Sequence, residues 1–321
     1  MTSEFSPQSP ARGLVDREQL AADFRCLGLR RGQDLLIHCS LRQVGRIDGG
    51  AATLLNAILD VTGPKATLVV PTHTTLNSLS SRAFHAATSG LGADERARFV
   101  SAMPGFDPAT TPSTGMGAFA EYLRTRPSSS RSSHPQASFA AIGPGARACT
   151  SVHDLDCHLG DRSPLGWLYT VDAAILLLGV GYSACTAFHL AEYRLLSEPP
   201  RLTYTCFISE GGARVEHEFT GIELDDTDFG PLGAALESAA TQDTGSGLCQ
   251  GQVGSAESRL VPLRLAVDFG RSWLEAHRGG LYRDKAVSVL SILTAHPIPW
   301  GQQRWGGRWD ARCPTMERLF S

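Results

Sequence analysis

The sequence of 321 residues lacks several features that would assign a class of protein at once. It has no apolar run of membrane-spanning length, and its first residues do not show the basic and then apolar segments of a secretion signal. Its 29 lysines and arginines nearly balance its 32 aspartates and glutamates, so no strongly basic surface is indicated. We therefore expect a cytoplasmic protein with no membrane and no nucleic-acid partner.

Cysteine and histidine are present, but without the spacing of a zinc site. The eight cysteines are scattered and form no C-x-x-C pair. This usage fits a reducing compartment better than it fits a disulfide framework. Residues 153–158, HDLDCH, are of types that bind metals, but no pair of ligands on one helix is evident. We therefore expect no metal.

Nucleotide-binding and hydrolase motifs are incomplete. The segment 38–45, HCSLRQVG, lacks the Gly-Lys-Ser/Thr ending of a phosphate-binding P-loop. A dinucleotide fingerprint at Gly179 lacks its third glycine, and neither Ser40 nor Ser183 lies in the G-x-S-x-G turn of a serine nucleophile. The segment 38–45 still precedes a predicted helix, whose N-terminus can hold an anion. An ordinary structural turn is the alternative there.

What the sequence does contain is a set of short apolar runs. Residues 35–38, 67–70 and 175–178 are typical of strands buried on both faces. A helical pattern at 51–61 lies between the first two, which favours a right-handed crossover and a parallel pair. Polar side chains follow the three runs, and they are His38 and Ser40, Thr72 to Thr74, and Ser183 to His189. Because ligands bind at the carboxyl ends of parallel strands, we expect these loops to share one edge.

The remainder of the chain carries other patterns. Alternating segments at 202–209 and 213–219 flank two glycines, which predicts a β-hairpin. We expect residues 245–254 to be a glycine-rich loop and residues 262–277 to be a helix. A further short helix is predicted at 93–103.

Together these patterns predict an α/β fold with a mixed, mostly parallel sheet flanked by helices and a smaller antiparallel β addition in the C-terminal third. We expect residues 1–14 to be a disordered tail, 15–295 a single α/β domain and 296–321 a loosely structured tail. A boundary near residue 200 is an open alternative, because the pattern changes there. The weakly patterned segment 78–112 is interpreted as an excursion over the mouth of the site.

His189 and Glu192 are the candidate catalytic pair. They lie three residues apart in a helical pattern, so both side chains are on one face of the helix. A carboxylate in this position can orient an imidazole, fix its tautomer and stabilise its protonated form. The alternative is an ordinary pair on a solvated helix, which is common.

Pieces of the sequence resemble the antibiotic N-acetyltransferases of the aminoglycoside 3-N-acetyltransferase type, and they follow in the order of that family over most of residues 15–275. The matching pieces are HCSLRQVG, GGAATLLNAILDVTGPKATLVVPTHT, MPGFDPATTPSTGMGAFAEYLRTRPSSSRSSHPQASFAAIGP, VHDLDCHLGDRSPLGWLY, LLLGVGYSACTAFHLAEYR, FTGIELDDTDF and GQVGSAESRLVPLRLAVDFGRSWL. Cys39 stands where the family usually has serine, and Cys185 replaces a common asparagine.

The resemblance implies an N-acetyltransferase with acetyl-CoA as cosubstrate and an α/β fold distinct from that of the commonest N-acetyltransferase superfamily. His189 and Glu192 match the H-L-A-E catalytic motif of the family, and His153 matches a second histidine close to the site. The residues implied to bind the coenzyme are His38, Ser40, Leu41, Arg42, Val44, Gly45, Thr72, Ser113 and Gly115.

The partner implied is a small-molecule amine acceptor, foremost an aminoglycoside acetylated at its 3-amino group. We expect direct attack of the amine on the thioester in a ternary complex, with His189 as general base. A polycationic acceptor calls for an acidic pocket, and we expect Asp154, Glu223 and Asp228 to line it.

Three alternatives and the oligomeric state stay open. In the first, the acceptor is a different amine from a biosynthetic or self-protection pathway. In the second, the chain is a non-catalytic CoA-binding module. In the third, Ser40 is the nucleophile of a hydrolase. A homodimer is a further open alternative.

Overall fold

The computed structural model of the protein describes residues 14–242 and 245–295. The predicted tail at 296–321 and all but the last residue of the tail at 1–14 lie outside the described residues. The chain divides into two compact units, which meet in sequence between Tyr282 and Arg283. The described part of the second unit is a stretch of helix, residues 283–295. The predicted domain limits stay a prediction.

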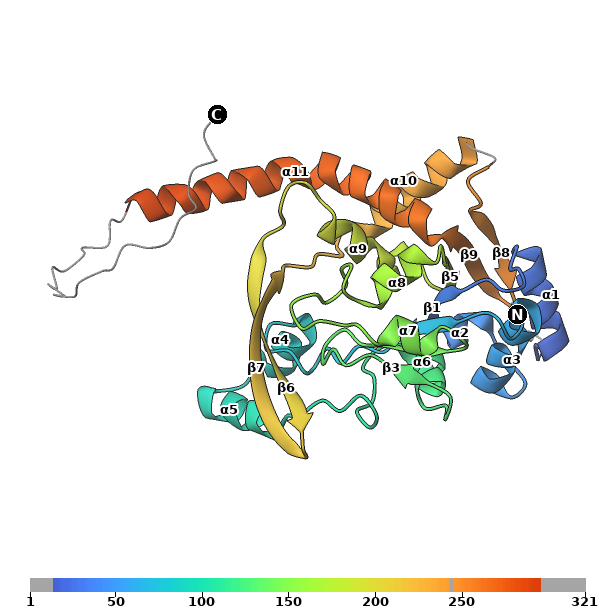
Figure 1. The fold of residues 1–321 in the computed structure, drawn as a ribbon, viewed down its shortest axis with the longest axis horizontal. Helices are drawn as coiled ribbons and strands as arrows, with labels where there is room; N and C mark the ends of the chain where they lie inside the picture. The colour runs from blue at the N-terminus through green and yellow to red at the C-terminus, as the bar shows by residue number, and fades with distance from the viewer. Residues whose placement is uncertain (1–13, 243–244, 296–321) are drawn as a thin grey trace, which may run out of the picture. The chain divides into compact units, whose positions relative to one another are not determined.

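A seven-stranded mixed sheet forms the centre of the first unit (Figure 1). Its strands, in order across the sheet, are β3 (Ser130–Arg131), β4 (Phe139–Ile142), β2 (Leu68–Pro71), β1 (Leu35–Cys39), β5 (Ala174–Leu178), β9 (Ala256–Pro262) and β8 (Cys249–Val253). The predicted mixed sheet is confirmed, but its parallel part is smaller than predicted. It is the central trio β2, β1 and β5, and the other neighbouring strands of the sheet pair antiparallel.

The parallel trio brings three loops to one edge of the sheet. Leu35 of β1 pairs with Leu68 of β2 and with Ala174 of β5, so the three strands run in register. The backbone N–H of Ser40, just after β1, donates to the carbonyl of Leu178 at the end of β5, at 2.9 Å. The predicted common edge for the three strand-end loops is therefore confirmed.

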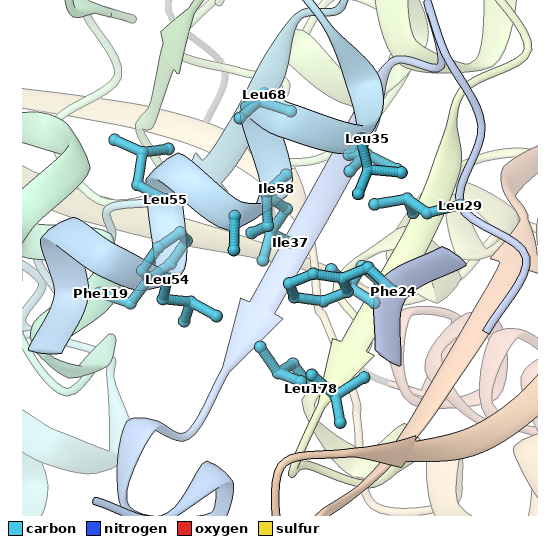
Figure 2. Close-up of a cluster of buried hydrophobic side chains, with 14 of the residues drawn as sticks. Phe24, Leu29, Leu35, Ile37, Leu54, Leu55, Ile58, Leu68, Phe119 and Leu178 are labelled. Atoms are coloured by element: carbon cyan, nitrogen blue, oxygen red, sulfur yellow. The ribbon is translucent and has the colours of Figure 1, made fainter. Parts of the chain in front are cut away.

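The apolar runs form strands because both faces of the sheet are covered. Alternate residues of a strand point to opposite faces, and accordingly Ile37 and Leu36 belong to two different apolar clusters. Figure 2 shows the first cluster, in which Phe24 and Ile58 pack around Ile37. Burying each such side chain contributes about 1.5–3 kcal/mol to the free energy of unfolding.

The helices that cover the sheet fall into two groups. Helices α1 (Arg17–Cys26), α3 (Gly50–Thr62) and α6 (Gly117–Arg124) supply the first cluster. Helices α7 (Ala146–Thr150), α8 (Pro164–Thr170), α9 (Ala187–Tyr193), α10 (Phe229–Gln242) and α11 (Leu263–Ala295) supply the second. The short elements α2 (Leu41–Val44) and η1 (Tyr182–Ala184) follow β1 and β5. They lie at the edge of the sheet where the parallel strands end, which we call the binding edge because ligands are expected there.

The predicted hairpin is present as a separate two-stranded sheet of β6 (Arg201–Glu210) and β7 (Ala213–Ile222). It lies beside the predicted excursion, which folds into α4 (Arg82–Thr88) and α5 (Ala93–Ala102) (Figure 1). Asn77 joins the two, because its buried side chain donates to the carbonyl of Phe207 at 2.7 Å and accepts from the N–H of Phe207 at 2.8 Å. The predicted helix at 93–103 is confirmed, whereas α4 was not predicted.

The predicted loop at 245–254 is wrong, because residues 249–253 form the edge strand β8, paired antiparallel with β9. Val253 is buried, whereas Gln250 and Gln252 face solvent. A Cβ on Gly251 would lie 3.4 Å from Leu27. Leu27, the residue after α1, thus packs beside the strand, and the lack of a side chain at Gly251 interrupts the alternating pattern. The helix predicted at 262–277 is present as the first part of the longer α11.

Replacing Gly179 by alanine should destabilise the fold at the binding edge. Gly179 has a positive φ of 66°, and a Cβ there would lie 2.6 Å from the Cβ of Gln43. We expect Gly179→Ala to lower the free energy of unfolding by about 2–3 kcal/mol in urea titrations, from left-handed strain and displacement of the loop after β1. Gly181 in the same motif has nothing within 4 Å of its Cβ position. The control Gly181→Ala should therefore change stability by less than about 0.5 kcal/mol; equal losses in the two variants would contradict the packing described.

Candidate active site

The His189–Glu192 pair lies on α9, which follows β5 and η1 at the binding edge. Nδ1 of His189 lies 2.5 Å from Oε2 of Glu192. A carboxylate oxygen accepts, so Nδ1 carries a proton, and in the neutral imidazole Nε2 is then the nitrogen with the lone pair. The His189 side chain is 12% exposed and the Glu192 side chain 1%. The pair thus has the geometry of an oriented base in a nearly dry site.

Glu192 is held from the side opposite His189. Its Oε1 accepts from the backbone N–H of Asp225 at 3.1 Å and from Nη1 of Arg278 at 2.5 Å. Both carboxylate oxygens are therefore engaged, which fixes the plane of the carboxylate relative to the imidazole. Arg278 comes from α11, 86 residues along the chain, and sequence reasoning missed it.

The carboxylates predicted to line the acceptor pocket lie in different surroundings. Asp228 accepts from Nε of Arg278 at 2.7 Å and also from Nη2. Asp154 pairs with Arg162 at 2.5 Å, on the exposed surface. The Glu223 side chain is exposed. Their predicted role in binding the acceptor stays a prediction, with two of the three carboxylates engaged by arginine.

Two further imidazoles lie at the ends of β1 and β2. His38 is buried, and its Nε2 lies 3.3 Å from the hydroxyl of Thr186, which directly precedes α9. Burial lowers the pKa of His38 to about 4. Burial, and then the nearby imidazoles of His189 and His38, lower the pKa of His73 to about 3. His73 was predicted only as part of a polar strand end, and the structure places it beside the catalytic pair.

The residues predicted to bind the coenzyme gather around the same edge. Ser40 lies at the start of α2, and Arg42 is exposed. The loop 113–115 is brought to β2 by a bond of 2.7 Å from the Thr114 N–H to the His73 carbonyl. Leu41, the first residue of α2, packs against the core, and the loop residues Gly45 and Gly115 have positive φ angles.

Three of the residues predicted to bind the coenzyme have side chains that are already buried or hydrogen-bonded within the protein. The Val44 side chain is fully buried in the core. The hydroxyl of Thr72 accepts from Nε of Arg131 at 3.1 Å and lies 3.3 Å from the hydroxyl of Ser138. Ser113 donates from both its N–H and its hydroxyl to Glu121, at 3.1 and 2.7 Å. The backbone of Val44 is hydrogen-bonded as well, to the carbonyl of Ser40 and the N–H of Ser255. To bind a ligand, Thr72 and Ser113 would have to exchange existing bonds.

His153 has no free ring nitrogen. Its Nε2 donates to the carbonyl of His158 at 2.7 Å, so Nδ1 is unprotonated and accepts from the Ser132 hydroxyl at 2.9 Å. The ring centroid of His134 lies 4.7 Å away, and burial lowers the pKa of His153 to about 4. The catalytic role predicted for His153 stays a prediction. The geometry is that of a buried, neutral histidine with both ring nitrogens hydrogen-bonded within the protein.

Within residues 14–242 and 245–295, no group of three or more histidine, cysteine, aspartate or glutamate side chains has the arrangement to hold a metal ion. No helix in the same part of the chain combines the length and the apolarity needed to cross a membrane.

Comparison with known proteins gives consistent matches along the chain. The family described as aminoglycoside 3-N-acetyltransferase matches residues 36–275. The chain is 34% identical over 278 residues to aminoglycoside N(3)-acetyltransferase VII of Streptomyces paromomycinus, covering 83% of this chain and 94% of that protein. It is 33% identical over 264 residues to the SPbeta prophage-derived aminoglycoside N(3')-acetyltransferase-like protein YokD of Bacillus subtilis, covering 80% and 91%.

Solved structures agree with these matches. The crystal structure of YokD superposes with a TM-score of 0.74 at 32% identity, covering 82% of this chain and 94% of that chain. A structure of AAC-IIIb binary with CoASH superposes with a TM-score of 0.69 at 26% identity, covering 83% and 98%. The protein is thus an N-acetyltransferase of the class that uses acetyl-CoA. Within that class, the chain belongs to the aminoglycoside 3-N-acetyltransferase family.

Buried histidines should make the fold sensitive to mild acid. His38, His73, His153 and His158 have pKa values lowered to about 3–4, chiefly by burial, whereas an unfolded histidine binds a proton near pH 6.5. Below about pH 6.5 the unfolded chain therefore binds protons that the native chain does not. The free energy of unfolding should fall by up to about 1.4 kcal/mol per pH unit for each such histidine.

Urea unfolding midpoints between pH 7.5 and pH 5 measure this effect. The loss should begin near pH 6.5 and continue below pH 5 toward the native pKa values of about 3–4, and the range from pH 7.5 to pH 5 records its first part, before most carboxylates titrate. The variant His85→Gln changes an exposed imidazole on α4 and should leave the slope unchanged. A midpoint that stays constant over this range would contradict neutral burial of these rings.

Proposed function

We propose that the protein acetylates an amino group of an aminoglycoside, foremost the 3-amino group, by direct attack of the amine on acetyl-CoA with His189 as general base. The observation that carries this proposal is the short contact between His189 and a buried Glu192 at the carboxyl edge of the parallel strands. It leaves Nε2 of the imidazole as the available base at the place where such sheets bind ligands.

The chemistry needs one proton to move twice. As the amine nitrogen bonds to the thioester carbonyl carbon, Nε2 of His189 takes a proton from that nitrogen. Glu192 accepts from Nδ1 and stabilises the imidazolium formed. When the carbon–sulfur bond breaks, the same proton passes to the leaving sulfur, which restores the neutral imidazole. A bound ternary complex supplies the proximity for this step.

Support for the coenzyme site comes from the arrangement of the strand-end loops. Ser40 and Arg42 after β1, and Gly115 in the loop tied to β2, are accessible on one edge of the sheet. The relative AAC-IIIb has been solved with CoASH, and it shares this fold. We therefore place the thioester between these loops and His189.

An amine with fewer positive charges is the second candidate acceptor, and one observation favours it. Asp228 and Asp154, two of the three carboxylates expected to attract a polycation, are each engaged by an arginine. The carboxylate charge that remains for a polycationic antibiotic is correspondingly smaller. A simpler amino sugar needs less of it.

Release of coenzyme A thiol from acetyl-CoA, measured across a panel of amines, tests this function. We expect rapid release with an aminoglycoside that has a free 3-amino group, and none with the same compound blocked at that nitrogen. Turnover confined to simpler amino sugars would replace the aminoglycoside by the second candidate. Absence of turnover, together with absence of coenzyme binding in calorimetry, would contradict the transferase itself.

A further inference from the structure

We propose that Arg278 is a positioning residue that sets the proton affinity of the His189–Glu192 pair, with Asp228 moderating it from the other side of the guanidinium. The inference rests on the proposed function in one respect: it assigns the pair the role of base in acetyl transfer. The contacts themselves are independent of that role.

The guanidinium joins the catalytic pair to two other segments. Arg278 is 4% exposed, and its Nη1 donates to Oε1 of Glu192 at 2.5 Å. Its Nε donates to Oδ2 of Asp228 at 2.7 Å, and its Nη2 donates to the backbone carbonyl of Asp225 at 2.7 Å. The donors of one planar group thus fix α9 and the segment before α10 at once.

Burial explains why the pair needs this cation. A carboxylate that is 1% exposed loses nearly all its hydration, so its charged form is costly unless an opposite charge is adjacent. In the neutral form that can act as a base, the imidazole on Oε2 supplies no net charge. Arg278 on Oε1 supplies it, and leaves Oε2 to accept the N–H of His189.

Other ionisable groups face the pair from the surrounding elements. They are Asp225 and Asp228 before α10, His73 after β2, His158 from the segment before α8, and Tyr204 of β6. Burial lowers the pKa of His73 and of His158 to about 3 and raises that of Tyr204 to about 12, so these three are uncharged near neutral pH. Within this set the charged groups near neutral pH are therefore the two aspartates, and they act on the pair together with the guanidinium of Arg278.

Two substitutions should therefore act with opposite signs. Removing the cation in Arg278→Met makes a proton on the pair more favourable, so His189 should become protonated at a pH higher by about one unit or more. Asp228→Asn keeps the shape but removes a negative charge from the guanidinium. The full positive charge then acts on Glu192, and His189 should become protonated at a lower pH.

The measurement is an NMR titration of the His189 imidazole in the whole enzyme, assigned by comparison with His189→Gln, together with the pH dependence of kcat/KM. The acid limb of kcat/KM reports the free enzyme and should move in the same direction as the titration. Arg278→Lys keeps the positive charge but loses the planar set of N–H donors. The His189 titration in this variant should stay near that of the native enzyme, while turnover falls severalfold. Arg271→Met removes an exposed arginine of the same helix and should change neither.

The expected order of titration pH is Asp228→Asn lowest, the native enzyme and Arg278→Lys between, and Arg278→Met highest. Folded Arg278→Met and Asp228→Asn proteins that titrate like the native enzyme would overturn the proposal. If Arg278→Met fails to fold, the downward shift in Asp228→Asn decides alone. If the titrations shift in order but the acid limb of kcat/KM does not follow, Arg278 keeps its role on the pair and the general-base function of His189 fails.

Discussion

The buried carboxylate of Glu192 is the constraint on which the site depends. A charge with 1% exposure persists only where donors surround it, and here they come from α9, from the segment before α10 and from α11. Segments far apart in sequence must therefore be in place before His189 has its orienting partner. This makes the site a property of the whole first unit and not of one helix.

The same exclusion of water shapes the rest of the binding edge. His38 and His73 lie at strand ends where burial keeps them neutral. The rings of His153 and His158 are held by hydrogen bonds to Ser132 and Gln136, respectively. Low polarity around His189 strengthens its interaction with Glu192. The stronger His189–Glu192 interaction comes with a loss of fold stability in acid, because both result from the burial of imidazoles away from water.

The sequence predicts the parts of this arrangement that are local. Apolar runs give the parallel strands and their common edge, and i, i+3 spacing gives the contact of His189 with Glu192. The partner of Glu192 could not be predicted, because Arg278 is 86 residues away and no periodicity links the two. The docking of the hairpin through Asn77 spans 130 residues and has no local signal either. Strand β8 was missed because Gly251, two residues before the buried Val253, has no side chain that would continue the alternation.

The most direct test of the central role of His189 is to measure acetyl transfer and coenzyme binding side by side in a His189→Ala protein. Removal of the base should lower kcat by about 10²–10⁴-fold. The dissociation constant of coenzyme A should stay within about threefold, because in the proposed mechanism His189 acts on the attacking amine and does not bind the coenzyme. Transfer at the native rate would contradict the general base. Equal loss of transfer and of coenzyme binding would instead make His189 a coenzyme contact.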